Sequence, residues 1–318
     1  MKKSIKPLKD HITDFLEYTE VEKGLSNKTQ ENYKMFLNKF LEFLGSANRL
    51  EIKPHELNAK DVWNYKLFLA RSRSFSTGSI LKKTTQHYYL IALRSLLNYF
   101  TDRDIESMPS SKVNLPKNNL RNQKIKFLTL DQIRTLLDSP NTKNKQGLRD
   151  KALLELLFST GMRVSEVMSL NVNQFDSKKI DQELSITGKG NKARVVYISE
   201  RAMQWIKKYL STRSDVSPAL FINYRPSSEL TDEKRLTVRS IERIIKHYVK
   251  LTGLPAFTSP HTLRHSYATD LLSQGVDIRS IQEFLGHSHI ATTQVYTHVT
   301  NKRLKDIHKK YHSGSRLS

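Results

Sequence analysis

The sequence predicts a mainly α-helical protein of two domains, in which the second domain carries one small antiparallel β-hairpin. Apolar residues recur at helical spacing through most of the chain, and a clear strand-like hairpin pattern occurs only between Leu184 and Ile198. The helical periodicity stops across residues 108–126, where prolines stand among asparagines and basic residues as in an extended linker. With 318 residues, the chain is long enough for a separate core on each side of this linker.

Residues 1–107 are expected to form a compact helical bundle. Four helices are predicted to begin near Leu8, Ser26, Asn58 and Thr84. Gly24 and Gly45 are expected to end the first two, because glycine readily adopts the left-handed conformation that closes a helix. The side chains expected to face the core from the third and fourth helices are Val62, Trp63, Leu67, Phe68 or Leu69, Tyr88, Ile91, Ala92, Ser95, Leu96 and Tyr99.

Residues 127–300 are expected to form the second domain. Thr129 is a predicted N-cap for a helix that ends near Leu137. The next helix, Arg149–Thr160, is apolar on most sides and should therefore be buried, with Gly161 as its stop. After the hairpin, further helices are expected at about 199–211, 237–251 and 260–274, with Ser199, Thr237 and Ser259 as N-caps and Pro260 at a first helical position.

The charge of the chain points to a polyanionic partner, and to nucleic acid before a membrane. Lys and Arg outnumber Asp and Glu by 53 to 31, which gives a net charge of +22. Residues 1–118 carry 20 basic and 13 acidic side chains, and residues 119–318 carry 33 and 18. Both parts could contact a phosphate backbone, the second more strongly. Charge alone leaves open an ordinary protein from a lysine-rich proteome.

The composition also excludes several classes of protein. There is no cysteine, so disulfides, thiolate chemistry and cysteine-ligated zinc are excluded. The basic N-terminus runs directly into polar residues, without the apolar core of a signal peptide, and no apolar run approaches the length of a membrane span. We therefore expect a cytoplasmic, nucleoid-associated protein with no membrane partner.

Several residues suit an attack on a phosphodiester that uses no metal. His261 and Arg264 are three positions apart on a predicted helix, so they share one face, and Arg163 follows the helix stop at Gly161. Arginine binds phosphate through a planar fork that stays charged, and the hydroxyl of Tyr296 is a candidate nucleophile. Taken singly, each arginine could equally serve only in a salt bridge.

Five segments, in this order and spacing, resemble the catalytic boxes of the tyrosine recombinases, the lambda-integrase superfamily. They are Ser159–Glu166, Thr187–Arg194, His261–His265, Leu285–His287 and Thr292–His298. The first part of the chain, including Glu22–Ser26, Thr29 and Tyr33, resembles the core-binding domain of that family. The resemblance covers most of the chain and is nearest to the Xer-type recombinases. It implies a DNA-binding domain over 1–107, a linker over 108–126 and a catalytic domain over 127–300.

The resemblance implies that a tyrosine cuts the DNA strand. Tyr296 would attack the phosphate, leaving a 3′-phosphotyrosine and a free 5′-hydroxyl. Arg163 and Arg264 would clamp the scissile phosphate, and Lys189 at the hairpin tip would protonate the leaving 5′-oxygen. His261 would assist proton transfer at the tyrosine, which suits an imidazole near neutral pH.

Three further residues are implied to support this reaction. His287 would donate a hydrogen bond to the phosphate, and Glu166 would orient its neighbours without reacting. We expect His265 to be structural, hydrogen-bonded beneath the site. The competitors for the main roles are Tyr267 and Tyr311 as nucleophile and Lys192 as proton donor.

No cofactor is expected. The chain has no phosphate-binding loop of the Gly-x-x-x-x-Gly-Lys-[Ser/Thr] type, and storage of the phosphodiester energy in a phosphotyrosine would make ATP unnecessary. His287, His289 and His298 could suggest zinc, but their spacing gives no clear ligand set and no carboxylate cluster joins them. We therefore expect neither metal nor ATP.

The expected function is site-specific recombination of double-stranded DNA by a homotetramer on two sites, through a Holliday junction. Residues 301–318 carry an amphipathic pattern that the resemblance links to a tail helix docking in trans on a neighbouring subunit; folding back on its own domain is the alternative. Resolution of chromosome or plasmid dimers is the expected role. Integration or excision of a mobile element is the rival within the same chemistry, and a non-catalytic DNA-binding protein is the rival from another class. The sequence does not decide whether the reaction requires a partner recombinase or a translocase activator.

Overall fold

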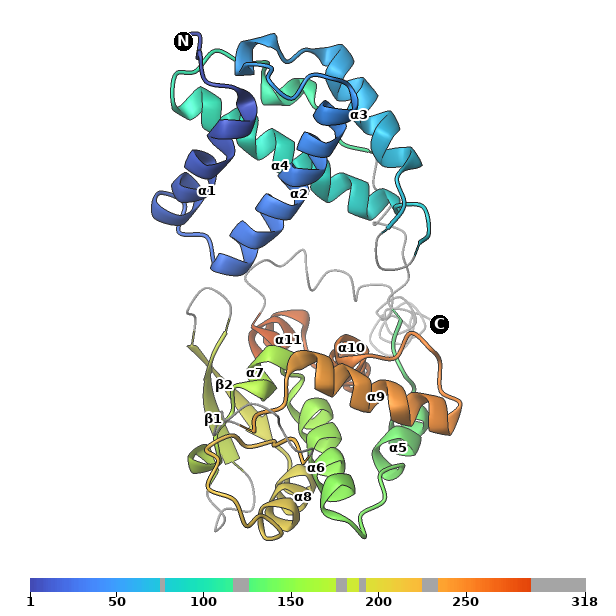
Figure 1. Cartoon of the computed structure of the whole chain (residues 1–318). Helices are drawn as coiled ribbons and strands as arrows, with labels where there is room; N and C mark the ends of the chain where they lie inside the picture. The colour runs from blue at the N-terminus through green and yellow to red at the C-terminus, as the bar shows by residue number, and fades with distance from the viewer. Residues whose placement is uncertain (75–77, 117–125, 176–181, 189–192, 225–233, 287–318) are drawn as a thin grey trace, which may run out of the picture. The chain divides into compact units, whose positions relative to one another are not determined.

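The computed structural model divides the chain into two compact units, unit 1 (residues 1–123) and unit 2 (residues 124–318). It describes residues 1–74, 78–116, 126–175, 182–188, 193–224 and 234–286. Each unit has a hydrophobic core of its own. Helices dominate both units, and the described strands form one two-stranded antiparallel sheet in unit 2 (Figure 1). The predicted fold class is therefore confirmed.

Unit 1 is built from four helices, α1 (His11–Val21), α2 (Asn27–Ser46), α3 (Ala59–Arg71) and α4 (Lys83–Asp102). Helices α2 and α4 pack against each other, and α1 and α3 contact both of them. Ser26 is the N-cap residue of α2, as predicted. Asn58 caps α3 through its side chain, which accepts the backbone N–H groups of Lys60 and Asp61. Clustered aromatic rings, such as Phe40 against Tyr65 at 4.8 Å between centroids, fill the core.

Two of the aromatic residues expected in this core lie outside it. Trp63 is 60% exposed and Tyr88 is 56% exposed. On α3 the buried stripe runs through Val62, Tyr65 and Leu69, which recur at helical spacing, and Trp63 lies beside that stripe. Tyr88 instead stacks on Phe36 at the surface of the bundle, with 6.2 Å between ring centroids. The prediction that Trp63 and Tyr88 face the core is therefore wrong, because the observed phase of each helix turns them to the surface.

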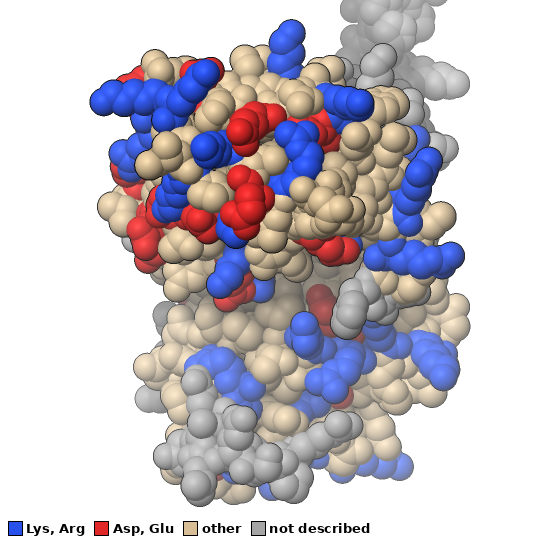
Figure 2. Space-filling model, turned by 45° about the horizontal axis from the view of Figure 1, so that its top comes forward, with Lys and Arg blue, Asp and Glu red and all other residues tan. Residues whose placement is uncertain are grey.

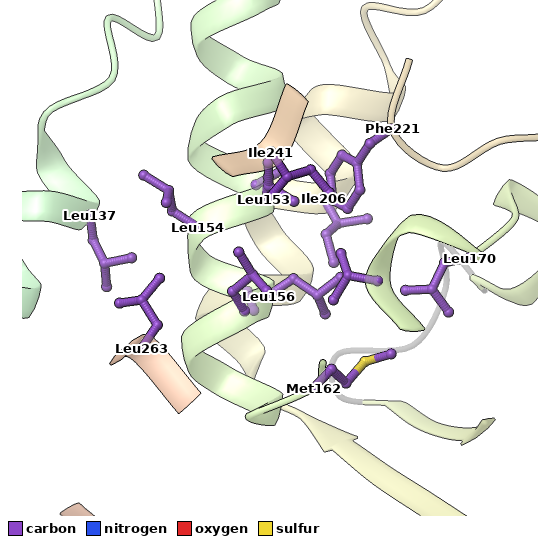
Figure 3. Close-up of a cluster of buried hydrophobic side chains, with 14 of the residues drawn as sticks. Leu137, Leu153, Leu154, Leu156, Met162, Leu170, Ile206, Phe221, Ile241 and Leu263 are labelled. Carbon is purple, nitrogen blue, oxygen red and sulfur yellow. The ribbon is translucent and has the colours of Figure 1, made fainter. Parts of the chain in front are cut away.

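Unit 2 is organised around helix α6 (Lys145–Thr160). Helices α5 (Leu130–Asp138), α8 (Glu200–Leu210) and α10 (Pro260–Gln274) pack against it, as does strand β2. Figure 3 shows Leu153, Leu154 and Leu156 of α6 among leucines and isoleucines from the surrounding elements. Nearly the whole circumference of α6 is buried, as its apolar sequence predicted.

The hairpin consists of strands β1 (Gln182–Thr187) and β2 (Ala193–Ile198), paired antiparallel from Gln182 opposite Ile198 to Thr187 opposite Ala193. Helix α9 (Val238–Thr252) follows later in the chain and packs on α5, α10 and the short helix α7 (Val164–Met168). Thr129, Thr237, Ser199 and Ser259 each accept a backbone N–H at the start of their helices, as predicted. Two short helices were not predicted, α7 (Val164–Met168) and α11 (Ile278–Leu285).

The surface charge differs between the units. On the face drawn in Figure 2, Lys and Arg of unit 1 are interspersed with Asp and Glu, whereas the charged residues in view on the described part of unit 2 are mostly Lys and Arg. This agrees with the uneven charge along the sequence. Within the described residues, no helix combines the length and apolar character needed to cross a membrane.

Candidate active site

The site begins where helix α6 ends. Gly161 closes α6 in the left-handed conformation, with φ of 58°, and its carbonyl accepts a hydrogen bond from Arg264 Nη1 at 2.7 Å. A Cβ atom at this position would lie 2.5 Å from Cδ1 of Tyr267. Glycine is therefore required twice here, for its backbone conformation and for the close approach of an aromatic ring.

Arg163 stands at the N-cap of α7, two residues after this turn. Its backbone N–H donates to Glu166 Oε2 at 2.7 Å, and its Nη1 donates to Glu166 Oε1 at 2.9 Å. Glu166 is thus bound to both the backbone and the side chain of Arg163. The Arg163 side chain remains 32% exposed, so its guanidinium is fixed at one edge and accessible at the surface.

A second arginine holds the same carboxylate. Arg194 of β2 donates from Nη1 to Glu166 Oε1 at 2.9 Å and from Nη2 to Glu166 Oε2 at 2.8 Å. Burial by itself would raise the pKa of Glu166, but the hydrogen bonds from Arg194 and the Arg163 amide, with the attraction of the Arg194 charge, outweigh it and lower this pKa to about 2. Glu166 is therefore ionised throughout the physiological range.

The C-terminal end of α11 holds three arginines through consecutive backbone carbonyls. Phe284 O accepts from Arg194 Nε at 3.2 Å, Leu285 O from Arg264 Nη2 at 2.5 Å, and Gly286 O from Arg163 Nη2 at 3.0 Å. The last carbonyls of a helix lack partners within the helix and carry the negative end of its dipole. The C-terminal end of a helix therefore binds guanidinium groups well. Here it binds one arginine each from the start of α7, from β2 and from α10.

Arg264 is the most deeply placed of these cations, at 3% exposure. Its two described hydrogen bonds tie the end of α6 to the end of α11. Burial of a guanidinium is costly unless its donors are satisfied, and the two carbonyls meet that need in part. The prediction that Arg264 lies near Arg163 is supported by their shared attachment to α11.

Two histidines lie on the same helix, α10, next to these arginines. The rings of His261 and His265 are 4.2 Å apart between centroids. Burial lowers the pKa of His261, and the charges of Arg264 and Arg163 lower it further. The pKa of His265 is lowered to about 4, first by burial and then by His261 and Arg264. Both imidazoles are therefore neutral at pH 7, so His261 can accept a proton there.

Four predicted or competing residues fall outside the described part of the chain: Lys189, Lys192, His287 and Tyr296. The same holds for Tyr311, His289, His298 and the tail 301–318. Tyr267, the other competing nucleophile, is described. It packs against Gly161, and burial raises its pKa, which makes its phenolate harder to form.

Arg194 belongs to this cluster of charged residues, and it was not singled out from the sequence. It was part of a matched segment, but no role was assigned to it. A signal was present, because strand alternation places Arg194 on the same face as Val196 and Ile198, which are buried. A cation on the apolar face of a strand needs a buried partner, and Glu166 is that partner.

Among the described residues, no group of three or more His, Cys, Asp or Glu side chains is arranged to hold a metal ion. The charge at the described part of the site comes instead from Arg163, Arg194 and Arg264, with Glu166 between two of them. Such an arrangement favours a bound anion with several oxygens, and a phosphate fits that description.

Comparison with known proteins identifies the class. Residues 126–303 match the model of the phage integrase family, and residues 12–104 match the N-terminal SAM-like domain of phage integrases. The chain belongs to the phage integrase family, whose members include the tyrosine recombinases, and it is a site-specific DNA recombinase.

Within this family the chain is similar to Xer proteins over nearly its whole length. It is 35% identical to tyrosine recombinase XerC of Pelotomaculum thermopropionicum, covering 95% of this chain and 97% of that protein. It is 34% identical to tyrosine recombinase XerD of Listeria monocytogenes, covering 96% and 99%. In fold it resembles XerH recombinase in a post-cleavage complex with a palindromic difH substrate, with a TM-score of 0.73 at 22% identity, covering 96% of this chain and 97% of that one.

Proposed function

We propose that this recombinase cuts and rejoins double-stranded DNA through a 3′-phosphotyrosine at Tyr296 and resolves chromosome or plasmid dimers. The observation that carries the proposal is the convergence of Arg163 and Arg264 at the end of α11, with the neutral His261 beside them. Two fixed cations next to a proton acceptor suit in-line attack on a phosphodiester.

The proposed reaction balances without any added reagent. The Tyr296 oxygen forms a bond to phosphorus, the bond from phosphorus to the 5′-oxygen breaks, and Lys189 gives that oxygen a proton. The neutral imidazole of His261 accepts the tyrosine proton, while Arg163, Arg264 and His287 hold the nonbridging oxygens. Attack by the 5′-hydroxyl of another strand reverses these steps, so neither metal nor ATP is consumed.

The wider assembly is part of the proposal. Residues 1–107 would bind the DNA core site, residues 108–126 would link the two domains, and residues 127–300 would carry the chemistry. The tail 301–318 would dock in trans in a homotetramer on two sites, with strands exchanged through a Holliday junction. The dimer-resolution role is supported by the similarity to XerC and XerD over nearly the whole chain.

Integration or excision of a mobile element uses the same chemistry, so the bound DNA distinguishes the two roles. Sequencing of genomic DNA bound by the protein should reveal one main site near the replication terminus. Sites that flank a mobile element would contradict dimer resolution and favour integration. This experiment also supplies the cognate site for the tests below.

A nicked duplex that carries this site tests the covalent step, because loss of the short downstream strand traps the intermediate. We expect a covalent protein–DNA product in the presence of EDTA with the wild type and none with Tyr296→Phe, which lacks only the hydroxyl. Equal DNA binding by both proteins serves as the control. Absence of the product from the wild type would favour the non-catalytic alternative.

A further inference from the structure

We propose that Arg194 is a positioning residue of the recombinase reaction. It holds Glu166 in place, and through Glu166 it holds Arg163 next to the end of α11. The inference rests on the proposed function, because Arg163 is the group that would contact the phosphate. Arg194 itself is not assigned to the substrate: its side chain is 10% exposed and its described hydrogen bonds all go to protein atoms.

The contacts form a closed pattern around the Glu166 carboxylate. Oε1 accepts from Nη1 of Arg163 and from Nη1 of Arg194, both at 2.9 Å. Oε2 accepts from the backbone N–H of Arg163 at 2.7 Å and from Nη2 of Arg194 at 2.8 Å. Each oxygen is thus shared between the two arginines. The forked, two-point contact from Arg194 prevents rotation of the carboxylate, and a rotated carboxylate would no longer direct Arg163.

Arg194 also links the Glu166 carboxylate to the end of α11, where the carbonyl of Gly286 binds Arg163. Its Nε donates to Phe284 O, two residues before the carbonyl of Gly286 that binds Arg163. A Cβ atom at Gly286 would lie 2.8 Å from Cδ of Arg194, so the side chain passes directly over the glycine. Arg163 is therefore bound at Glu166 and at Gly286, and Arg194 contacts both supports.

The same side chain anchors the hairpin. Arg194 is the second residue of β2 and pairs with Ile186 of β1, close to the turn that carries Lys189 in the sequence. A single residue thus joins the base of that turn to Glu166 and to α11. Its replacement should disturb the position of catalytic groups without removing any group that contacts DNA directly.

The pKa of Glu166 gives a second, independent test of the contact between Arg194 and Glu166. If Arg194 is replaced by a neutral residue, burial of Glu166 remains while its strongest partner is lost, so the pKa of Glu166 rises. A protonated Glu166 cannot attract Arg163 as an anion. The pKa of Glu166 in the variant, followed by NMR of its carboxyl carbon, should therefore lie above the wild-type value of about 2.

The test uses the full chain and the nicked duplex carrying the cognate site, with Arg194→Gln and Arg194→Lys compared with a matched control. The control is Arg201→Gln, because Arg201 bonds to Glu155, another buried carboxylate that a second cation, Lys151, also contacts. We expect Arg194→Gln to slow covalent-complex formation by about 10²-fold, the cost of a misplaced catalytic group. Arg194→Lys should recover part of that loss, and the dissociation constant for the duplex should match that of the control.

A double variant separates positioning from general damage. If Arg194 acts through Glu166, then Arg194→Gln added to Glu166→Gln should slow cleavage much less than it does in the wild type. The pKa of Glu166 should rise in Arg194→Gln and stay at the wild-type value in Arg201→Gln.

Three results would each overturn the inference: Arg194→Gln cleaving at the rate of Arg201→Gln, effects that multiply fully in the double variant, or an unchanged pKa of Glu166 in Arg194→Gln. None of these would affect the proposed function, because the wild type would still form its Tyr296-dependent product. A wild type that forms no such product would overturn the proposed function and this inference with it.

Discussion

Arg264 shows how single residues of this site are fixed by backbone oxygens. A long side chain would normally sample many rotamers, but here its guanidinium spans the carbonyls of Gly161 and Leu285. Both carbonyls end helices, so the cation also satisfies backbone acceptors that would otherwise lack partners. The position of this arginine therefore depends on Gly161, a residue with no side chain.

Gly161→Ala tests this dependence, and Gly253→Ala is its matched control. Both glycines follow a helix at nearly the same φ, 58° and 65°, but only Gly161 would bring a Cβ against Tyr267. We expect Gly253→Ala to cost about 1–2 kcal/mol of unfolding free energy from backbone strain alone. Gly161→Ala should cost a further ~1–3 kcal/mol from overpacking. Denaturant unfolding followed by circular dichroism measures both, and equal losses would mean that Tyr267 moves aside without cost.

The residues of the site were predictable to different degrees. Arg163, Glu166 and Arg264 lie in matched segments, and the structure brings them together. Arg194 was missed because its role depends on Glu166, which is 28 residues away in the sequence and reaches it only after folding. Likewise, Trp63 was predicted on the core face of the third helix beside Val62, whereas its exposure follows from the observed phase of α3.

At the scale of elements, α11 contributes most to the site and was the hardest to predict. It has only eight residues, yet Ile281 and Leu285 are buried at helical spacing between the cap Asp277 and the terminating Gly286. These signals were present in the sequence, but a helix this short is marginal by itself, and the packing on α10 stabilises it. The longer helices of both units, with stronger periodicity and clear caps, were predicted close to their observed bounds.

Asp277→Ala should therefore weaken the hydrogen bonds from α11 to the three arginines, although Asp277 caps the opposite end of that helix. The Asp277 side chain accepts the backbone N–H groups of Arg279 and Ser280, both at 2.9 Å. Its loss should cost about 1 kcal/mol of unfolding free energy and weaken the first turn of α11. We expect slower formation of the covalent complex, because the carbonyls of Phe284, Leu285 and Gly286 shift with the helix.

Thr129→Ala provides the control for this element. Thr129 caps α5 by accepting the N–H of Gln132, so its loss should cost a similar unfolding free energy. Helix α5 holds none of the three arginines, and cleavage should stay at the wild-type rate. Equal cleavage rates for Asp277→Ala and Thr129→Ala would show that the cleavage rate does not depend on the hydrogen bonds between α11 and the arginines.

At the scale of the whole molecule, two separate cores support two units that both carry a net positive charge. The excess is larger after residue 118, where 33 basic residues stand against 18 acidic ones. Positive charge spread over both units suits a duplex contacted at many phosphates rather than at one. Binding of this kind releases counterions from the DNA, so its strength depends on salt.

We accordingly expect affinity for the cognate duplex to fall steeply between 50 and 200 mM salt, by about 10³-fold or more if six or more phosphates are contacted. Fluorescence anisotropy over a salt series gives the slope. A duplex of equal length without the site should show a similar slope at lower affinity, since phosphate contacts do not depend on sequence. Affinity that is unchanged by salt would contradict phosphate contacts in both units.

The hold of α11 on the three arginines also constrains the order in which this protein can become active. The bonds from Arg163 to Gly286 and from Arg194 to Phe284 span 123 and 90 positions of sequence, and Arg264, which binds Leu285 of α11, also reaches back 103 positions to Gly161 at the end of α6. Contacts between residues so far apart in the sequence form late in folding, because a long loop must be ordered before they can form. A nascent chain emerges N-terminus first, so the arginines gain their supports on α11 only after synthesis has passed Gly286. The proposed nucleophile, Tyr296, is added later still, so the cluster of arginines and the tyrosine can come together only when most of the chain has been made.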